Sequence, residues 1–185
     1  MIRDVLQDAE SRMKGAIHSL EADLATFRTG RASPHLLDRL VIEQYGVEMK
    51  LNQMAVVSVP EPQQIAIRPY DMSALSAIER AILKSDLGIM PNNDGKIIRL
   101  ILPRLTEERR RDLSKQVNRR VEEGKVAVRN VRRDAMHTLK ELKDETMISE
   151  DELKKGQSDL DDLSKKYVDL IDHVGKAKEA EIMEV

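Results

Sequence analysis

Every proline of this 185-residue chain falls between residues 34 and 103. The six positions are Pro34, Pro60, Pro62, Pro69, Pro91 and Pro103. Residues 1–33 and 104–185 therefore contain none. Because a proline inside a helix costs about 3 kcal/mol, this distribution predicts helical arms on both sides of an inserted domain that is richer in strands and turns.

Apolar residues in both proline-free segments recur at steps of three and four, the period of one helix face. Residues 3–28 carry one such stripe. Residues 106–146 carry a second, which predicts a helix roughly 60 Å long. This second stripe comprises Leu113, Val117, Val121, Val128, Val131, Ala135, Leu139 and Leu142. A third stripe follows Ser149, which forms a capping-box pattern with Glu152. The second and third helices are separated by few residues, so we expect antiparallel neighbours in an elongated three-helix bundle. The third stripe comprises Leu153, Leu160, Leu163, Tyr167, Leu170 and Val174.

The middle of the chain has a different pattern. Four short β-branched segments, at 40–45, 55–59, 64–68 and 97–102, are bounded by Gly, Pro or Asn and predict strands. One helix is expected between the last two, capped by Ser73 and closed by Gly88. The predicted fold class is thus α+β, with a bundle from residues 1–30 and 104–185 and a small domain from 31–103. A hinge is expected at the two connections, formed by Gly30, Arg31, Ala32, Ser33, Pro34, Pro103, Arg104 and Leu105.

The charge of the chain is unevenly distributed. The formal net charge is only −2, which by itself argues against a nucleic-acid partner. Residues 104–133, however, hold eleven Lys and Arg against five Asp and Glu, whereas residues 134–185 hold eight against fifteen. At 100° per residue, four basic residues align along the second helix and three more flank them. The aligned residues are Arg111, Lys115, Arg129 and Arg133, and the flanking ones are Arg119, Lys125 and Arg132.

Two interpretations of this basic helix face are open. Runs of charge are usually solvated faces, or here a face paired with the acidic third helix. The alternative is phosphate binding, because a guanidinium group matches a phosphate with a planar fork and stays charged. The only aromatic residues are Phe27, Tyr45, Tyr70 and Tyr167, too few for a base-stacking platform. If the face binds nucleic acid, the mode left open is recognition of folded RNA or of a duplex backbone by shape and charge. DNA is not excluded as the partner.

Other function classes find little support in the sequence. The four histidines, His18, His35, His137 and His173, lack metal-site spacing, so no metal ligands and no cofactor are expected. Nucleotide-binding glycine motifs and a nucleophile elbow are absent, so we predict no catalytic residues and no enzyme. The chain has no Cys, no membrane-length apolar stretch and no signal-peptide pattern at its start, which together predict a cytoplasmic protein without a membrane partner.

Several separate motifs resemble the bacterial ribosome recycling factor family. They are FRTGRASP at residues 27–34, SDLG at 85–88, PRLTEERR at 103–110 and VAVRNVRRDA at 126–135. The resemblance spans the whole chain. It implies an L-shaped molecule in which a three-helix bundle and a small β/α/β domain are joined by a flexible hinge.

The resemblance also implies a function. Members of this family act in translation after termination: they bind large-subunit ribosomal RNA and, with elongation factor G and GTP, split the ribosomal subunits and release mRNA. GTP is used by the partner. The arginines at Arg129, Arg132 and Arg133 would contact RNA, Arg132 foremost, and Arg110 and Arg31 lie in matching motifs. We expect a monomer. Two other hypotheses stay open from the residues alone: a coiled-coil adaptor that binds a protein, and an enzyme with its site in the middle domain.

Overall fold

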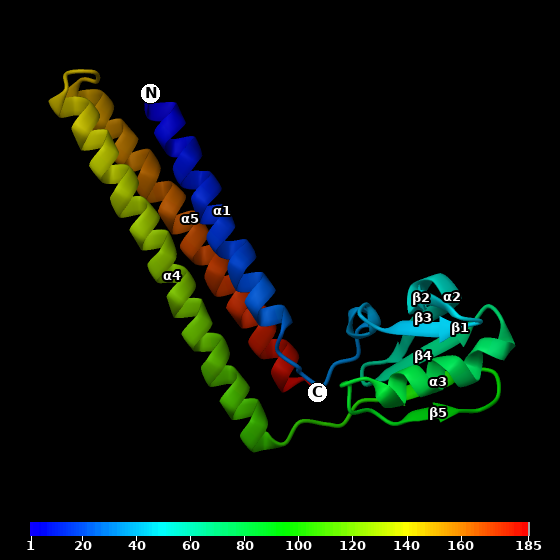
Figure 1. Cartoon of the computed structure of the whole chain (residues 1–185). Coiled ribbons are helices and arrows are strands. Elements are labelled where there is room, and N and C mark those ends of the chain that lie inside the picture. Colours follow the sequence, from blue (N-terminus) through cyan, green and yellow to red (C-terminus); the bar gives the residue numbers. More distant parts are fainter. Residues whose placement is uncertain (185) are drawn as a thin grey trace. The chain divides into compact units, whose positions relative to one another are not determined.

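The computed structural model describes residues 1–184, which fold as two compact units. One unit comprises Met1–Arg28 together with Glu107–Glu184, and the other comprises Thr29–Thr106. The first is made of helices and the second contains all the strands of the described residues (Figure 1).

Three long helices form the first unit: α1 (Ile2–Ala25), α4 (Glu107–Asp144) and α5 (Glu150–Met183). They lie side by side, with α4 antiparallel to the other two (Figure 1). The start of α5 is fixed by the predicted capping box. Ser149 Oγ accepts a hydrogen bond from the Glu152 backbone N–H at 3.2 Å, and Glu152 Oε2 accepts one from the Ser149 N–H at 2.8 Å. The expected three-helix bundle is confirmed.

The buried faces agree with the predicted stripe on α4 and agree only in part on α5, where Leu160 and Tyr167 are buried as expected. On α4 the buried residues include Leu113, Val117, Val121, Val128, Val131, Ala135 and Leu139, as expected. On α5 the prediction is wrong at Leu170, which is 41% exposed. The buried face of α5 instead comprises Gly156, Leu160, Ser164, Tyr167, Ile171, Gly175 and Ile182. Small residues take the inward positions because neighbouring helices approach closely there: a Cβ at Gly175 would lie 2.5 Å from Val121 Cγ2.

The second unit contains two antiparallel sheets. Their strands are β1 (Val41–Gln44), β2 (Val47–Lys50), β3 (Ala55–Glu61), β4 (Gln64–Pro69), β5 (Pro91–Asn93) and β6 (Ile98–Ile101). The first two strands form a hairpin, and the others form a sheet in the order β3-β4-β6-β5. All four predicted strands are present. The structure adds β2 and β5, both short and largely exposed, whose sequences carry little apolar signal.

Short helices complete this unit: η1 (Pro34–Leu37), α2 (Leu51–Met54), η2 (Met72–Ala74) and α3 (Leu75–Lys84). Helix α3 and one face of the larger sheet enclose the core. Its fully buried side chains include Ile42, Ile65, Ile67, Ile78, Ile82, Ile98 and Leu100.

The predicted ends of α3 are wrong. The Asp71 carboxylate caps the preceding turn, accepting from the Ser73 backbone N–H at 2.9 Å. The Ser73 hydroxyl instead lies 3.1 Å from the Tyr45 hydroxyl. The helix ends at Lys84 with Ser85 as its C-cap, before Gly88 is reached. Within the described residues, no helix is both long and apolar enough to cross a membrane.

Candidate nucleic-acid interface

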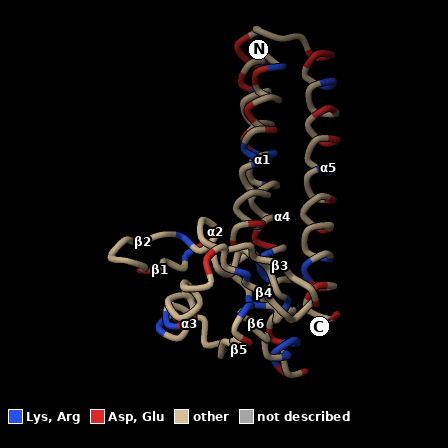
Figure 2. The backbone as a smooth tube through the Cα atoms, turned by 90° about the vertical axis from the view of Figure 1, so that its right-hand side faces the viewer, with Lys and Arg blue, Asp and Glu red and all other residues tan. Residues whose placement is uncertain are grey.

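A row of basic side chains follows the exposed side of α4. We call it the basic stripe, and it comprises Arg111, Lys115, Arg119, Arg129 and Arg133. All five are exposed, and they lie away from the arc of buried residues that begins at Leu113 and ends at Leu139. Because α4 is one uninterrupted helix, the five positive charges have fixed spacings along its axis. Figure 2 marks the basic and acidic positions along the chain.

Most of the basic stripe is not neutralised within the bundle. Among the described residues, the side chains of Lys115, Arg119 and Arg129 form no hydrogen bond or ion pair. Arg133 donates through Nη2 to the Asn130 side-chain oxygen at 3.1 Å, a neutral partner. Only Arg111 is paired, with Glu107 one turn earlier on the same helix. Pairing with the acidic helix α5 therefore does not account for this surface.

Arg132 lies beside the stripe and reaches α5. Its Nε donates to Asp161 Oδ1 at 2.6 Å, with the two side chains 44% and 52% exposed. An ion pair this open to solvent contributes little to stability, typically under about 1 kcal/mol. Around it, a shallow hollow on the surface of α4 is surrounded by Val126, Arg129, Asn130, Arg132, Arg133, Met136, His137 and Lys140. This hollow carries basic residues together with the apolar Val126 and Met136, and no acidic residue.

Lys125, expected to flank the stripe, is used inside the bundle. Its side chain is 16% exposed and donates to Asp172 Oδ1 on α5 at 2.6 Å and to Glu122 Oε1 at 3.1 Å. These hydrogen bonds to Asp172 and Glu122 raise the pKa of the Lys125 ammonium group. Lys125 thus forms an ion pair between α4 and α5 and is not a free cation.

Arg110 and Arg31 do not join the stripe. Arg110 is partly buried, and its Nη1 donates to the Met183 carbonyl at 3.3 Å, in the last turn of α5, while its Nε is buried without a partner. A cation is favourable there because the carbonyl end of a helix carries partial negative charge. Arg31 is exposed but belongs to the other unit.

The residues expected at the hinge fall into two groups. Ala32 is buried in the core of the small unit, and its N–H donates to the Pro62 carbonyl at 2.7 Å. Ser33 accepts from the His35 N–H at 3.3 Å and so caps η1, which begins at Pro34. Gly30, in contrast, has φ +77°, in the left-handed region that favours glycine.

The outgoing connection is anchored to the same turn of the small unit. The Leu102 N–H donates to the Gln63 carbonyl at 2.8 Å, and Arg104 Nε donates to the Gln63 side-chain oxygen at 3.3 Å. Pro103 is exposed and Leu105 is half-buried. Both chain connections are therefore fastened to the two-residue turn between β3 and β4.

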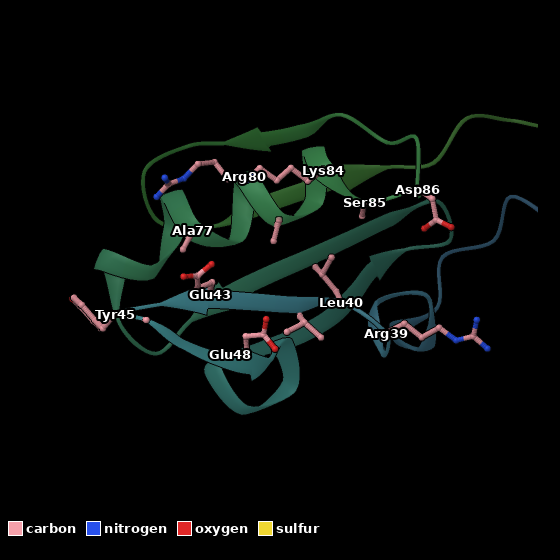
Figure 3. Close-up of a pocket in the computed structure, with 13 residues that line it drawn as sticks. Arg39, Leu40, Glu43, Tyr45, Glu48, Ala77, Arg80, Lys84, Ser85 and Asp86 are labelled. Carbon is pink, nitrogen blue, oxygen red and sulfur yellow. The ribbon is translucent and has the colours of Figure 1, made fainter.

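The other large hollow lies in the small unit, between the β1–β2 hairpin and α3 (Figure 3). Its charged residues have both signs: Arg39, Arg80 and Lys84 against Glu43, Glu48 and Asp86. This mixture does not select an anion or a cation. In residues 1–184, no three His, Cys, Asp or Glu side chains are placed to hold a metal ion.

Comparison with known proteins gives consistent matches over the whole chain. A family model described as ribosome recycling factor matches residues 20–183. Proteins named ribosome-recycling factor from Roseiflexus castenholzii and Halalkalibacterium halodurans are each 52% identical over 185 residues, covering 100% of both chains in each case.

Two solved structures are also similar. The solution structure of a ribosome recycling factor superposes with a TM-score of 0.75 at 42% identity, covering 100% of this chain and 98% of the other. The second is the T. thermophilus ribosome recycling factor, described with E. coli elongation factor G bound to the E. coli post-termination complex. It gives a TM-score of 0.64 at 40% identity, with 99% of each chain covered.

Proposed function

The chain belongs to the ribosome recycling factor family, and on that basis we propose that it disassembles the post-termination ribosome. It binds the ribosome after termination and, together with elongation factor G and GTP, releases mRNA and splits the subunits. A relative of the same family has been described with elongation factor G bound to the post-termination complex, which supports these two partners.

The contact with the ribosome is made through large-subunit ribosomal RNA and the basic stripe of α4. The observation that carries this proposal is the exposure of Arg129, Lys115 and Arg119 without any partner among the described residues. Unpaired cations on a rigid helix bind phosphates without first breaking an internal ion pair, and each phosphate that they neutralise releases counterions. Arg132 and Arg133 extend this contact, and Arg111 adds charge at the start of the helix.

Arg31 and Arg110 have more limited roles in this proposal. Arg31 contacts RNA from the connection between the units. Arg110 turns inward to the end of α5, so it acts on RNA only through its charge.

Motion at the hinge transmits the action of elongation factor G. The pivots are Gly30 and Arg31 on the incoming connection and Pro103 and Leu105 on the outgoing one, because Ala32, Leu102 and Arg104 are already fastened to the Pro62–Gln63 turn. Gly30, with its positive φ, supplies backbone freedom at the entry. The small unit swings on these connections while the bundle stays on the RNA.

No covalent chemistry by this chain is needed. GTP is hydrolysed by elongation factor G, and this chain acts as a monomeric cytoplasmic binding protein without a cofactor of its own.

A subunit-splitting assay tests the function directly. Post-termination ribosomes are mixed with this protein, with elongation factor G and with GTP, and each component is omitted in turn. We expect the subunits to split only when this protein, elongation factor G and GTP are all present. Light scattering monitors the splitting. Splitting of equal rate without this protein, or none in the full mixture, would contradict the proposal.

A further inference from the structure

The guanidinium group of Arg132 is held from one side only. Its Nε donates to Asp161 Oδ1 at 2.6 Å, and no other hydrogen bond or ion pair of the Arg132 side chain is found within residues 1–184. The two Nη atoms, which form the end of the planar fork, are therefore open. This end-on edge is one that recognises a phosphate with two parallel hydrogen bonds.

The position of Asp161 explains why this arrangement matters for binding. A free arginine side chain loses conformational freedom when it is immobilised on a partner, and this loss weakens binding. A carboxylate already bonded to Nε restricts the side chain before the phosphate arrives, so less freedom is lost on binding. Arg129, by contrast, has no such support.

We propose that Asp161 is a positioning residue for RNA recognition, holding Arg132 through Nε so that Nη1 and Nη2 face a backbone phosphate. This inference rests on the proposed RNA contact of α4 and deepens it. Asp161 itself touches no RNA in this arrangement. It acts through the orientation of Arg132.

A simple charge argument predicts the opposite effect. Asp161 is an anion near a phosphate, so its removal would strengthen RNA binding if repulsion dominated. Loss of positioning weakens binding instead. The sign of the effect of Asp161→Ala on affinity therefore separates the two, because alanine removes both the charge and the acceptor of the Arg132 hydrogen bond.

The test measures the affinity of full-length variants for the large ribosomal subunit at fixed salt. Asp161→Ala, which removes the acceptor of Arg132 Nε together with the charge, should weaken binding by about 2- to 10-fold, the range that corresponds to the freedom of one long side chain. Asp162→Ala is the matched control: it removes the same charge from the next position, which is exposed and whose side chain has no partner among the described residues. It should bind as tightly as the wild type or slightly more tightly.

Double variants that also change Arg132 show whether the effect of Asp161 on binding acts through Arg132 or through a loss of folding. In an Arg132→Ala background, Asp161→Ala should no longer weaken binding. In an Arg132→Lys background it should strengthen binding, because a single ammonium group cannot satisfy the carboxylate and the phosphate from two different edges. Thermal melts check that each variant is folded.

The outcomes also separate this inference from the function on which it rests. If Arg132→Ala weakens binding but Asp161→Ala binds as tightly as the wild type or more tightly, the positioning role is overturned and the RNA contact stands. If folded Arg132→Ala binds like the wild type, the RNA contact at this position is overturned, and the positioning role with it.

Discussion

Arg129 and Arg132 lie one helical turn apart on α4 but have different surroundings. Arg129 has no partner among the described residues, whereas Arg132 is bonded to Asp161 across the bundle. Helical spacing alone predicted that both side chains lie near one face of one helix. The carboxylate 29 positions away could not be predicted, because its proximity depends on the register between two packed helices. Two arginines with similar positions in the helical pattern therefore differ in whether an acidic side chain binds them.

Tyr167 is a second residue whose burial was predictable and whose partner was not. It is 3% exposed, and its hydroxyl donates to Glu10 Oε1 on α1 at 2.9 Å. Burial, together with this hydrogen bond and the Glu10 charge, raises the pKa of Tyr167 to about 12. The hydrogen bond from Tyr167, reinforced by Lys14, lowers the pKa of Glu10.

The raised pKa makes a prediction for Tyr167→Phe. Since the folded protein favours the neutral phenol, the stabilisation by Tyr167 is complete below its ordinary pKa of 10.0 and is lost as the pH rises to about 12. Tyr167→Phe should therefore cost about 1–2 kcal/mol at neutral pH, and the gap to wild type should close in alkali. Urea unfolding of both proteins from neutral pH to about pH 12 measures this difference in the free energy of unfolding.

The control for this measurement is Tyr70→Phe, at a tyrosine that is 70% exposed. It should leave the free energy of unfolding unchanged at every pH. A gap between wild type and Tyr167→Phe that stays constant up to pH 12 would mean that the phenol does not titrate as the structure indicates.

At the scale of elements, α4 was predictable and α5 was only partly so. The apolar stripe of α4 consists of branched residues that are buried, so periodicity and packing agree. On α5 the inward positions 156, 164 and 175 hold the small residues Gly156, Ser164 and Gly175. A search for periodic large apolar residues does not detect such positions. Close packing against Val121 and Leu139 selects small residues there, a constraint that exists only once the helices are assembled.

A pair of glycine substitutions tests this packing. A Cβ at Gly175 would lie 2.5 Å from Val121 Cγ2, whereas one at Gly15 on α1 would meet nothing within 4 Å. Both changes to alanine gain the same helix propensity, so the difference between them isolates the clash. Gly175→Ala should be less stable than Gly15→Ala by about 1–3 kcal/mol in urea unfolding, because overpacking forces side chains to move. Equal stability of the two variants would show that the helices do not approach as closely as described.

At the scale of the whole molecule, the net charge of −2 was uninformative and its distribution was not. The excess of basic residues between 104 and 133 lies mostly on the first part of α4, and the acidic excess lies beyond it. The charge of each segment could be read from the sequence. The sequence could not show which cations stay unpaired, because that depends on helix packing: Lys125 and Arg110 bind groups on α5, whereas Arg129 does not.

The division into two units leads to a prediction about movement. Two cysteines, at Ala25→Cys in the bundle unit and His35→Cys in the small unit, occupy exposed positions in a chain that has no native cysteine. Joining them with a short bifunctional thiol reagent should leave ribosome binding intact but abolish subunit splitting, because the small unit can no longer swing. The same variant without the reagent is the control. Splitting at an undiminished rate after cross-linking would show that domain motion is not required.

The central claim is that exposed cations on α4 bind ribosomal RNA by its phosphates, and the salt dependence of binding tests it most directly. The affinity for the large subunit should be measured across a range of salt for the wild type, Arg129→Ala and Arg132→Ala. We predict that each variant binds about 1–3 kcal/mol more weakly. Each should also show a salt slope shallower by somewhat less than one unit, the value for one lost phosphate contact. Folded variants that bind with the affinity and salt slope of the wild type would contradict the claim.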